Sequence, residues 1–230
     1  MHRFAVRLAI AMAVLLLSAC ATTPQAPVNL ADETFKQGGT KIGVVMTSVP
    51  KSDFSYPGAA CLLCMAAASM ANSSLIDHTR TLPNDDLKGL KKEISDLLTN
   101  KKMQAKVIDE PLVLKDLPSF PKKIDFAPKD FAAFASRYDI DLLYVVQIDS
   151  VGISRTYSAY VPTGDPKGMV TGAGYLIDLH TNKYEWFQPV SVSKSADGAW
   201  DEPPKFPGLS NAYFQAIELA RDAFKAPLTQ

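Results

Sequence analysis

Two of the three cysteines, Cys61 and Cys64, are separated only by Leu62 and Leu63. On the first turn of a helix, residues three apart share a face, so these thiols can form a disulfide. A helix N-terminus also lowers the pKa of a thiol, which would suit thiol–disulfide exchange. The two intervening leucines and the apolar helix that follows favour instead a structural disulfide or buried, inert thiols. We therefore predict a structural pair, with a periplasmic thiol–disulfide protein as the alternative function.

The other reactive residue types form no recognisable catalytic or metal-binding pattern. His78 lies fourteen residues after Cys64, about 21 Å along a continuous helix at 1.5 Å per residue. His180 follows Asp178 beside an expected turn. The stretch 172–174, Gly-Ala-Gly, lies inside an expected strand and opens no helix, so it is not a nucleotide-binding fingerprint. We expect no catalytic residue, no metal and no cofactor.

The N-terminal segment has the order of a secretory signal. Arg3 and Arg7 precede an apolar run over 8–17, which at about ten residues is too short to span a membrane. The run ends in Leu17-Ser18-Ala19-Cys20, which resembles the lipobox of bacterial lipoproteins. That resemblance implies cleavage before Cys20 and acyl chains, palmitate among them, on its sulfur and amine.

The lipobox resemblance also implies a location. Each buried methylene of an acyl chain contributes about 0.8 kcal/mol, and two or more chains hold a protein stably at a membrane. Lipoproteins retained at the inner membrane usually have Asp after the cysteine, whereas this chain has Ala21. We therefore expect a lipid-anchored protein on the periplasmic face of the outer membrane, with the lipid on Cys20 as its one covalent group.

Composition predicts one domain after the signal. We assign 1–19 to the signal peptide, 20–40 to a lipidated flexible tether rich in Pro and Gly, and 41–230 to a single periplasmic domain. Hydrophobic residues make up 47% of the chain, enough for a large core. The formal net charge is zero, and removal of Arg3 and Arg7 makes the mature chain slightly acidic. No basic face indicates a nucleic-acid partner.

Apolar periodicity predicts an α/β (α+β) domain. Helices are expected at 59–75, 84–102, 129–138 and 210–225, and strands at 41–49, 103–109, 141–149, 151–161, 169–179 and 184–192. A loop is expected at 50–58, and the four prolines of 110–128 predict irregular backbone there. The last helix has one apolar stripe that we expect to be buried: Leu209, Tyr213, Ile217, Ala220 and Phe224. The strand 141–149 is the most apolar and is expected at the centre of a mixed sheet of five or six strands. The last three strands are expected to form an antiparallel meander, with helices packed on the sheet.

The helix 59–75 is apolar nearly all round, so it is either buried or packed against a partner. Its large side chains, Leu62, Leu63, Met65 and Met70, are the candidate assembly surface. The partners we expect are other envelope proteins or a second copy of this chain.

The element order, the strand 142–146 and the stretch 174–183 with Trp186 resemble a superfamily of bacterial envelope proteins. Its members include the curli secretion channel lipoprotein, a lipoprotein activator of a penicillin-binding protein, and the N-terminal domain of TolB. The resemblance implies a non-enzymatic assembly, secretion or regulatory factor in the cell envelope.

Overall fold

The computed structural model describes residues 24–31, 33–35, 38–202 and 205–229. A six-stranded mixed sheet has the order β3-β1-β4-β7-β8, and β2 also pairs with β4. The strands are β1 (Lys41–Met46), β2 (Asp53–Ser55), β3 (Gln104–Val107), β4 (Leu142–Ser154), β7 (Lys167–Asp178) and β8 (Lys183–Ser195). Strands β1, β2 and β3 run parallel to their partners, whereas β4, β7 and β8 form an antiparallel meander. The predicted fold class and the central position of the strand 141–149 are therefore confirmed.

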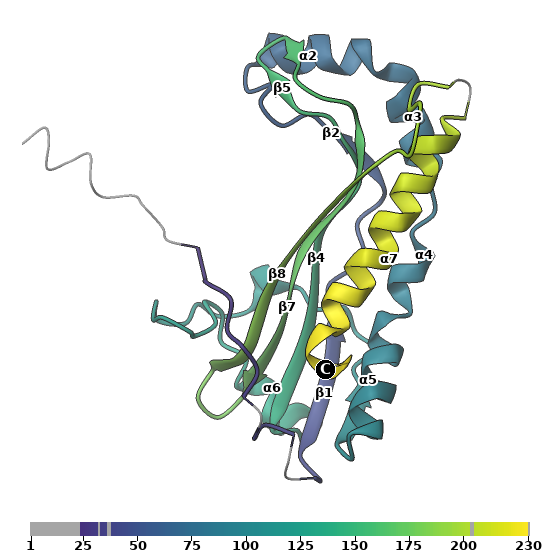
Figure 1. The fold of residues 1–230 in the computed structure, drawn as a ribbon. Helices are drawn as coiled ribbons and strands as arrows, with labels where there is room; N and C mark the ends of the chain where they lie inside the picture. Colours follow the sequence, from purple (N-terminus) through teal and green to yellow (C-terminus); the bar gives the residue numbers. More distant parts are fainter. Residues whose placement is uncertain (1–23, 32, 36–37, 203–204, 230) are drawn as a thin grey trace, which may run out of the picture.

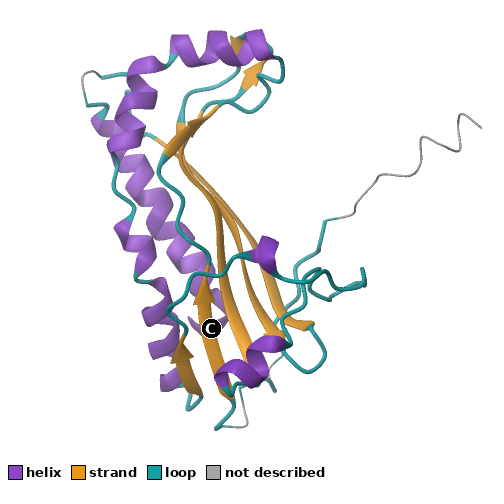
Figure 2. Ribbon diagram, turned by 180° about the vertical axis from the view of Figure 1, so that it is seen from behind, coloured by secondary structure: helices purple, strands orange, loops and turns teal. Residues whose placement is uncertain are grey.

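Helices cover both faces of the sheet (Figures 1 and 2). The helices of the described residues are α2 (Leu62–Ala71), α3 (Ser73–Thr81), α4 (Asp85–Lys88), α5 (Leu90–Asn100), α6 (Ala133–Tyr138) and α7 (Pro207–Thr229), with a 3-10 turn η1 (Leu114–Asp116). A separate two-stranded ribbon joins β5 (Tyr157–Ser158) to β6 (Val161–Pro162). Figure 1 shows a long molecule in which α2 and β5 lie at one end, beyond the sheet.

The larger core lies between α5, α7 and the first face of the sheet. The stripe predicted for the last helix is buried: Leu209, Tyr213, Ile217, Ala220 and Phe224 are each at most 1% exposed. The Tyr144 hydroxyl crosses this core and donates to the Phe224 carbonyl at 2.6 Å. Burial raises the pKa of Tyr144, so this phenol remains a neutral donor.

The second face of the sheet is covered by α6 and by the long segment between β3 and α6. Phe131, Val145, Tyr175 and Ile177 belong to this smaller core. Asn182, only 2% exposed, ties the segment down by donating from Nδ2 to the carbonyls of Ala127 and Lys129. The four prolines of this segment are compatible with its irregular backbone, as predicted.

Strand β4 is longer than predicted. The separate strands expected at 141–149 and 151–161 are one strand through Ser154, with an irregularity between Ile148 and Ser150. A β-bulge lets a strand pass polar residues without ending. The predicted loop at 50–58 contains β2, which pairs with the far half of β4.

The predicted helix at 59–75 is two helices. The buried Asn72 ends α2 and precedes α3, because its side chain donates to the Ala68 carbonyl and competes with the helix backbone. The chain turns here, so α2 extends beyond the sheet whereas α3 packs beside β2.

Part of the predicted flexible tether lies on the sheet. Val28 exchanges two backbone hydrogen bonds with Phe187 of β8, at 2.9 and 3.0 Å. Leu30 and Phe35 pack against the larger core. From Pro24 onward, the described part of this segment is therefore held against the domain and is not a free spacer.

Candidate functional site

Residues 57–72 and 156–163 form the end of the molecule farthest from α5, and we call them the tip (Figure 1). All four residues predicted as an assembly surface are here and exposed: Leu62 is 82% exposed, Leu63 72%, Met70 79% and Met65 37%. Of the two alternatives predicted for this helix, the structure does not show burial within the chain, and a surface available to a partner remains.

Only a narrow side of α2 is buried. Cys64 and Ala68, one helical turn apart, pack with Ala59 and Tyr157 in a small cluster separate from the main cores. Small side chains at these positions let the helix approach the β5–β6 ribbon closely. The large apolar side chains consequently point away from the ribbon.

The tip carries no charge. No Asp, Glu, Lys or Arg occurs between 54 and 76 or between 156 and 164. Tyr160 and Val161 of the ribbon add to the apolar surface, at 55% and 64% exposed. Depletion of charge with enrichment in Met and aromatic residues is typical of the central part of a protein interface.

Asn72 fastens the tip to the sheet. Its Nδ2 donates to the Ala68 carbonyl and to the Tyr157 hydroxyl, both at 2.6 Å. Its Oδ1 accepts from Arg155 Nη1 at 3.2 Å, and the Arg155 guanidinium stacks on Trp200. This buried amide is thus satisfied on both sides and fixes the tip in one orientation.

A backbone crossing also holds the two segments of the tip together. Gly58 adopts φ +90°, and a Cβ there would overlap the Tyr157 carbonyl oxygen. Tyr157 N–H donates to the Pro57 carbonyl at 2.8 Å. Only glycine allows the chains to approach this closely with this backbone conformation.

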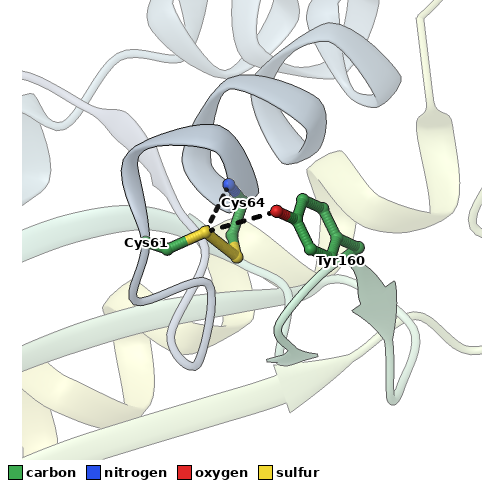
Figure 3. Close-up of a disulfide and its surroundings, with 3 residues drawn as sticks. All are labelled: Cys61, Cys64 and Tyr160. Atoms are coloured by element: carbon green, nitrogen blue, oxygen red, sulfur yellow. Dashed lines mark hydrogen bonds between the residues drawn. A yellow bond between two sulfur atoms is a disulfide. The ribbon is translucent and has the colours of Figure 1, made fainter.

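Cys61 and Cys64 are joined in a disulfide at the start of α2, with Cα atoms 4.9 Å apart (Figure 3). Cys61 is the N-cap, and its Sγ accepts from the Cys64 N–H at 2.9 Å. The Tyr160 hydroxyl lies 3.7 Å from the same sulfur, which in a disulfide can only accept. The bond ties down the first turn of the helix that carries the exposed leucines.

The two cysteine residues differ in exposure. Cys61 is exposed whereas Cys64 is 3% exposed. Cys61 is therefore the residue of the disulfide nearer to solvent, and the Cys64 N–H donor and the helix N-terminus would stabilise a thiolate on its sulfur. The predicted inert, buried surroundings apply only to Cys64.

The histidines lie apart from the cysteines. His78 Nε2 bonds to Ser210 Oγ at 2.7 Å, and burial lowers the pKa of its imidazole. His180 is exposed in the β7–β8 turn. Within the described ranges, no group of His, Cys, Asp or Glu side chains could hold a metal ion.

The lipobox and Cys20 lie outside the described residues. Among the described helices, none is long and apolar enough to cross a membrane.

A hollow of about 1100 Å³ on the second face of the sheet was not predicted from the sequence. It lies between the segment 114–131, residues 24–26, and strands β4, β7 and β8. Its aromatic residues come from three separate parts of the chain: the segment 114–131, β7 and β8. The only sequence signal was the apolar and aromatic content of an otherwise irregular, Pro-rich segment.

Comparison with known proteins shows only distant likeness. No family model matches the chain, and no curated protein sequence matches it. Among solved structures, a PelC dodecamer from Paraburkholderia phytofirmans is 12% identical, with 88% of this chain and 94% of that chain covered and a TM-score of 0.34. A lipoprotein from Neisseria meningitidis is 10% identical, with 78% of this chain and 99% of that chain covered and a TM-score of 0.32. TM-scores this low do not establish a relationship.

Proposed function

We propose that this chain is a lipid-anchored protein of the bacterial outer membrane that acts without catalysis in assembly, secretion or regulation. The anchor is the acylated Cys20, and Ala21 after it directs the protein to the outer membrane. The domain lies on the periplasmic face and works through contacts with protein partners.

The observation that carries the proposal is the uncharged, exposed tip. Leu62, Leu63 and Met70 are each more than 70% exposed on one short helix. Covering apolar surface yields about 25 cal/mol per Å² removed from water. Exposed apolar side chains are ordinary when scattered, but three of them on one ten-residue helix without a charged residue are typical of an interaction site.

We propose a second copy of this chain as the occupant of the tip. A surface with no charged residue meets no like-charge repulsion when it faces itself, so self-contact is electrostatically permitted. The small side chains Ala66 and Ala67, both exposed, allow two α2 helices to approach closely. Because the tip extends beyond the sheet, its α2 face is accessible to another copy.

The test is the oligomeric state of the chain from residue 20 with Cys20→Ser, measured by sedimentation velocity over a wide concentration range. We expect reversible association that Leu62→Glu/Leu63→Glu weakens at least tenfold, because the variant would bury two carboxylates in an apolar contact. Ile124→Glu/Leu219→Glu is the matched control, since these residues are 84% and 50% exposed elsewhere. The control should associate like the parent chain.

Two results would contradict self-association. One is a parent chain that stays monomeric at every concentration. The other is equal weakening by the tip variant and its control. Binding of the parent chain to vesicles of phosphatidylethanolamine and phosphatidylglycerol, lost in Leu62→Glu/Leu63→Glu, would assign the tip to lipid and overturn self-association as well.

The exposed residue Cys61 keeps thiol–disulfide exchange as a second candidate function. A partner thiolate would attack Cys61 Sγ and release Cys64 as the leaving thiolate. A second partner thiol would then resolve the mixed disulfide, leaving two thiols here and a disulfide in the partner. The test is the variant Cys61→Ser/Cys64→Ser, assayed for exchange with a dithiol and, by sedimentation velocity, for association. Loss of exchange with unchanged association would favour this candidate.

A further inference from the structure

The hollow on the second face of the sheet is separate from the tip, since they share no residue. Its floor is a cluster of rings from two strands and one loop: Phe131, Tyr175, Tyr184 and Phe187. The Tyr184 and Phe187 ring centroids are 4.9 Å apart, and Tyr175 stacks on Phe187 at 6.0 Å. Phe131, Tyr175 and Tyr184 are at most 5% exposed and Phe187 is half-buried, so the floor is apolar, and a ligand gains by covering the part that remains accessible.

The rim of the hollow carries positive charge that no carboxylate neutralises directly. Lys122, Lys123 and Lys129 belong to the lining, and none of them forms an ion pair with a described residue. Lys129 Nζ donates to the Leu117 carbonyl at 3.0 Å, and Lys123 Nζ lies 4.1 Å from the Phe126 ring centroid. Lys122 and Lys123 are exposed at the entrance, where a ligand anion can reach them.

The two acidic residues of the lining already accept hydrogen bonds from neutral amides. Asp125 Oδ1 accepts from Gln25 Nε2 at 3.1 Å, and Asp149 Oδ1 accepts from Gln147 Nε2 at 2.8 Å. Gln147 Oε1 in turn accepts from the Tyr175 hydroxyl at 3.2 Å. Asp125 and Gln25 form one pair, and Asp149, Gln147 and Tyr175 form a second group, whereas the two lysines at the entrance form no ion pair with a described residue.

Tyr184 supplies a neutral donor at the floor of the hollow. The residue is 5% exposed, its hydroxyl bonds to no described residue, and the oxygen itself is accessible to solvent. Burial raises the pKa of Tyr184 to about 12, so the phenol is neutral and can donate to an oxygen of a ligand.

We infer that the hollow binds a single-chain amphiphile with an anionic head group. The acyl chain lies on the aromatic floor, and the head group lies at the entrance beside Lys122 and Lys123. A purely polar ligand would make no apolar contact with the aromatic floor. A cationic amphiphile would be repelled by the lysines at the entrance. The volume of about 1100 Å³ is slightly above the roughly 300–1000 Å³ typical of small-molecule sites. A carboxylate head and a phosphate head share this chemistry, so fatty acids and lysophospholipids are both included.

The test uses calorimetric titration of the chain from residue 20 with Cys20→Ser, below the critical micelle concentration of each probe. Palmitate and palmitoyl lysophosphatidylglycerol are the anionic probes, and palmitoyl lysophosphatidylcholine is the zwitterionic probe. We expect the anionic probes to bind at least tenfold more tightly than the zwitterionic one. Binding of palmitate alone would assign the head group as a carboxylate, and binding of both anions would admit a phosphate.

The variant Lys122→Glu/Lys123→Glu should weaken the anionic probes at least tenfold, whereas Lys51→Glu/Lys205→Glu should not weaken them. The control changes net charge equally at two exposed lysines outside the lining. Tyr184→Phe should weaken binding severalfold without changing the fold, checked by circular dichroism. The inference is overturned if no anionic probe binds, if all three probes bind equally, or if both double variants weaken binding alike. None of these outcomes depends on the oligomeric state, so the tip proposal stands or falls separately.

Discussion

Glu93 on α5 accepts hydrogen bonds from two cations on α7, Arg221 and Lys225, the latter at 3.1 Å. These side chains are only 16–33% exposed. Burial alone would raise the pKa of the Glu93 carboxyl, but the hydrogen bonds and charges of Arg221 and Lys225 outweigh burial and lower it. The contact therefore links the two helices of the larger core through a carboxylate that must be ionised.

We predict that Glu93→Gln lowers the free energy of unfolding by about 1 kcal/mol near neutral pH. The folded-state pKa lies below the unfolded one, so this contribution is present above the ordinary value of 4.5 and is lost as pH falls through the lowered folded value. The difference between parent and variant should therefore shrink in strongly acidic buffer. Urea titrations at a series of pH values measure it.

Asp96→Asn is the matched control for Glu93→Gln. Asp96 lies on the same helix, but its partner Lys92 is 79% exposed and both belong to α5. We expect a change below about 0.5 kcal/mol, as for other pairs within one exposed helix. A Glu93→Gln effect no larger than this control would show that the link between α5 and α7 contributes nothing measurable.

At the scale of single residues, the sequence predicted burial better than it predicted polar partners. Tyr213 and Phe224 were placed in the helix stripe because apolar spacing alone defines a buried face. Nothing near Asn72 in the sequence indicated that it would meet Tyr157 and Arg155, which are more than eighty residues away. Such contacts depend on tertiary packing, which a local pattern does not contain.

Among the elements, β2 depends on one close approach. Asp53 pairs with Gly152 in β4, and a Cβ at position 152 would overlap the Asp53 carbonyl oxygen. Strand β2 leads directly into the tip, and Phe54 packs with Leu75 of α3 beneath it. Displacement of β2 therefore loosens the junction between the tip and the sheet.

We predict that Gly152→Ala destabilises this junction by about 2 kcal/mol or more. Amide hydrogen exchange should quicken in 53–76 and 157–162, with little change in β1 and α5. Gly89→Ala is the control, because a Cβ there meets only ordinary contacts and alanine favours a helix. Gly89→Ala should leave amide exchange in the tip unchanged. If Gly152→Ala changed the exchange rate equally along the whole chain, the prediction would be contradicted.

Prediction of elements failed where long-range pairing overrode a local signal. The polar Asp149-Ser150 indicated the end of a strand, but the bulge carries β4 past it because β7 continues to pair alongside. β2 is only three residues long and has no periodicity of its own. By contrast, the central strand 141–149 was recognisable because its residues 143–146 are buried on both faces of the sheet.

For the whole molecule, the hollow could not be predicted, because its lining comes from five separate parts of the chain. The tip could be predicted in part. The sequence indicated an apolar helix, but not whether that helix would be buried by the rest of the chain or by a partner. The N-terminal region shows a similar limit. Its Pro and Gly content indicated a flexible spacer, yet Val28 pairs with the edge of the sheet.

The pairing of Val28 bears on where the domain would lie relative to a bilayer. Cys20 precedes Pro24 by four residues, which span at most about 14 Å when fully extended. If Cys20 is acylated, the domain is held close to the membrane surface instead of at the end of a long spacer. The acylated Cys20 and the uncharged tip are then two separate means of membrane attachment. Variants of Cys20 and of the tip should therefore distribute differently between the membrane and soluble fractions.

We predict that Cys20→Ala moves the protein from the membrane fraction to the soluble fraction and abolishes incorporation of labelled palmitate. Two or more acyl chains hold a protein stably, so removal of their attachment site removes most of the membrane affinity. Leu62→Glu/Leu63→Glu should remain in the membrane fraction and stay labelled, because the tip binds protein in our proposal. The opposite result would be that Cys20→Ala, although unlabelled, stays in the membrane fraction and leaves it only when Leu62→Glu/Leu63→Glu is added. That result would show that the tip, and not the lipid, anchors the protein.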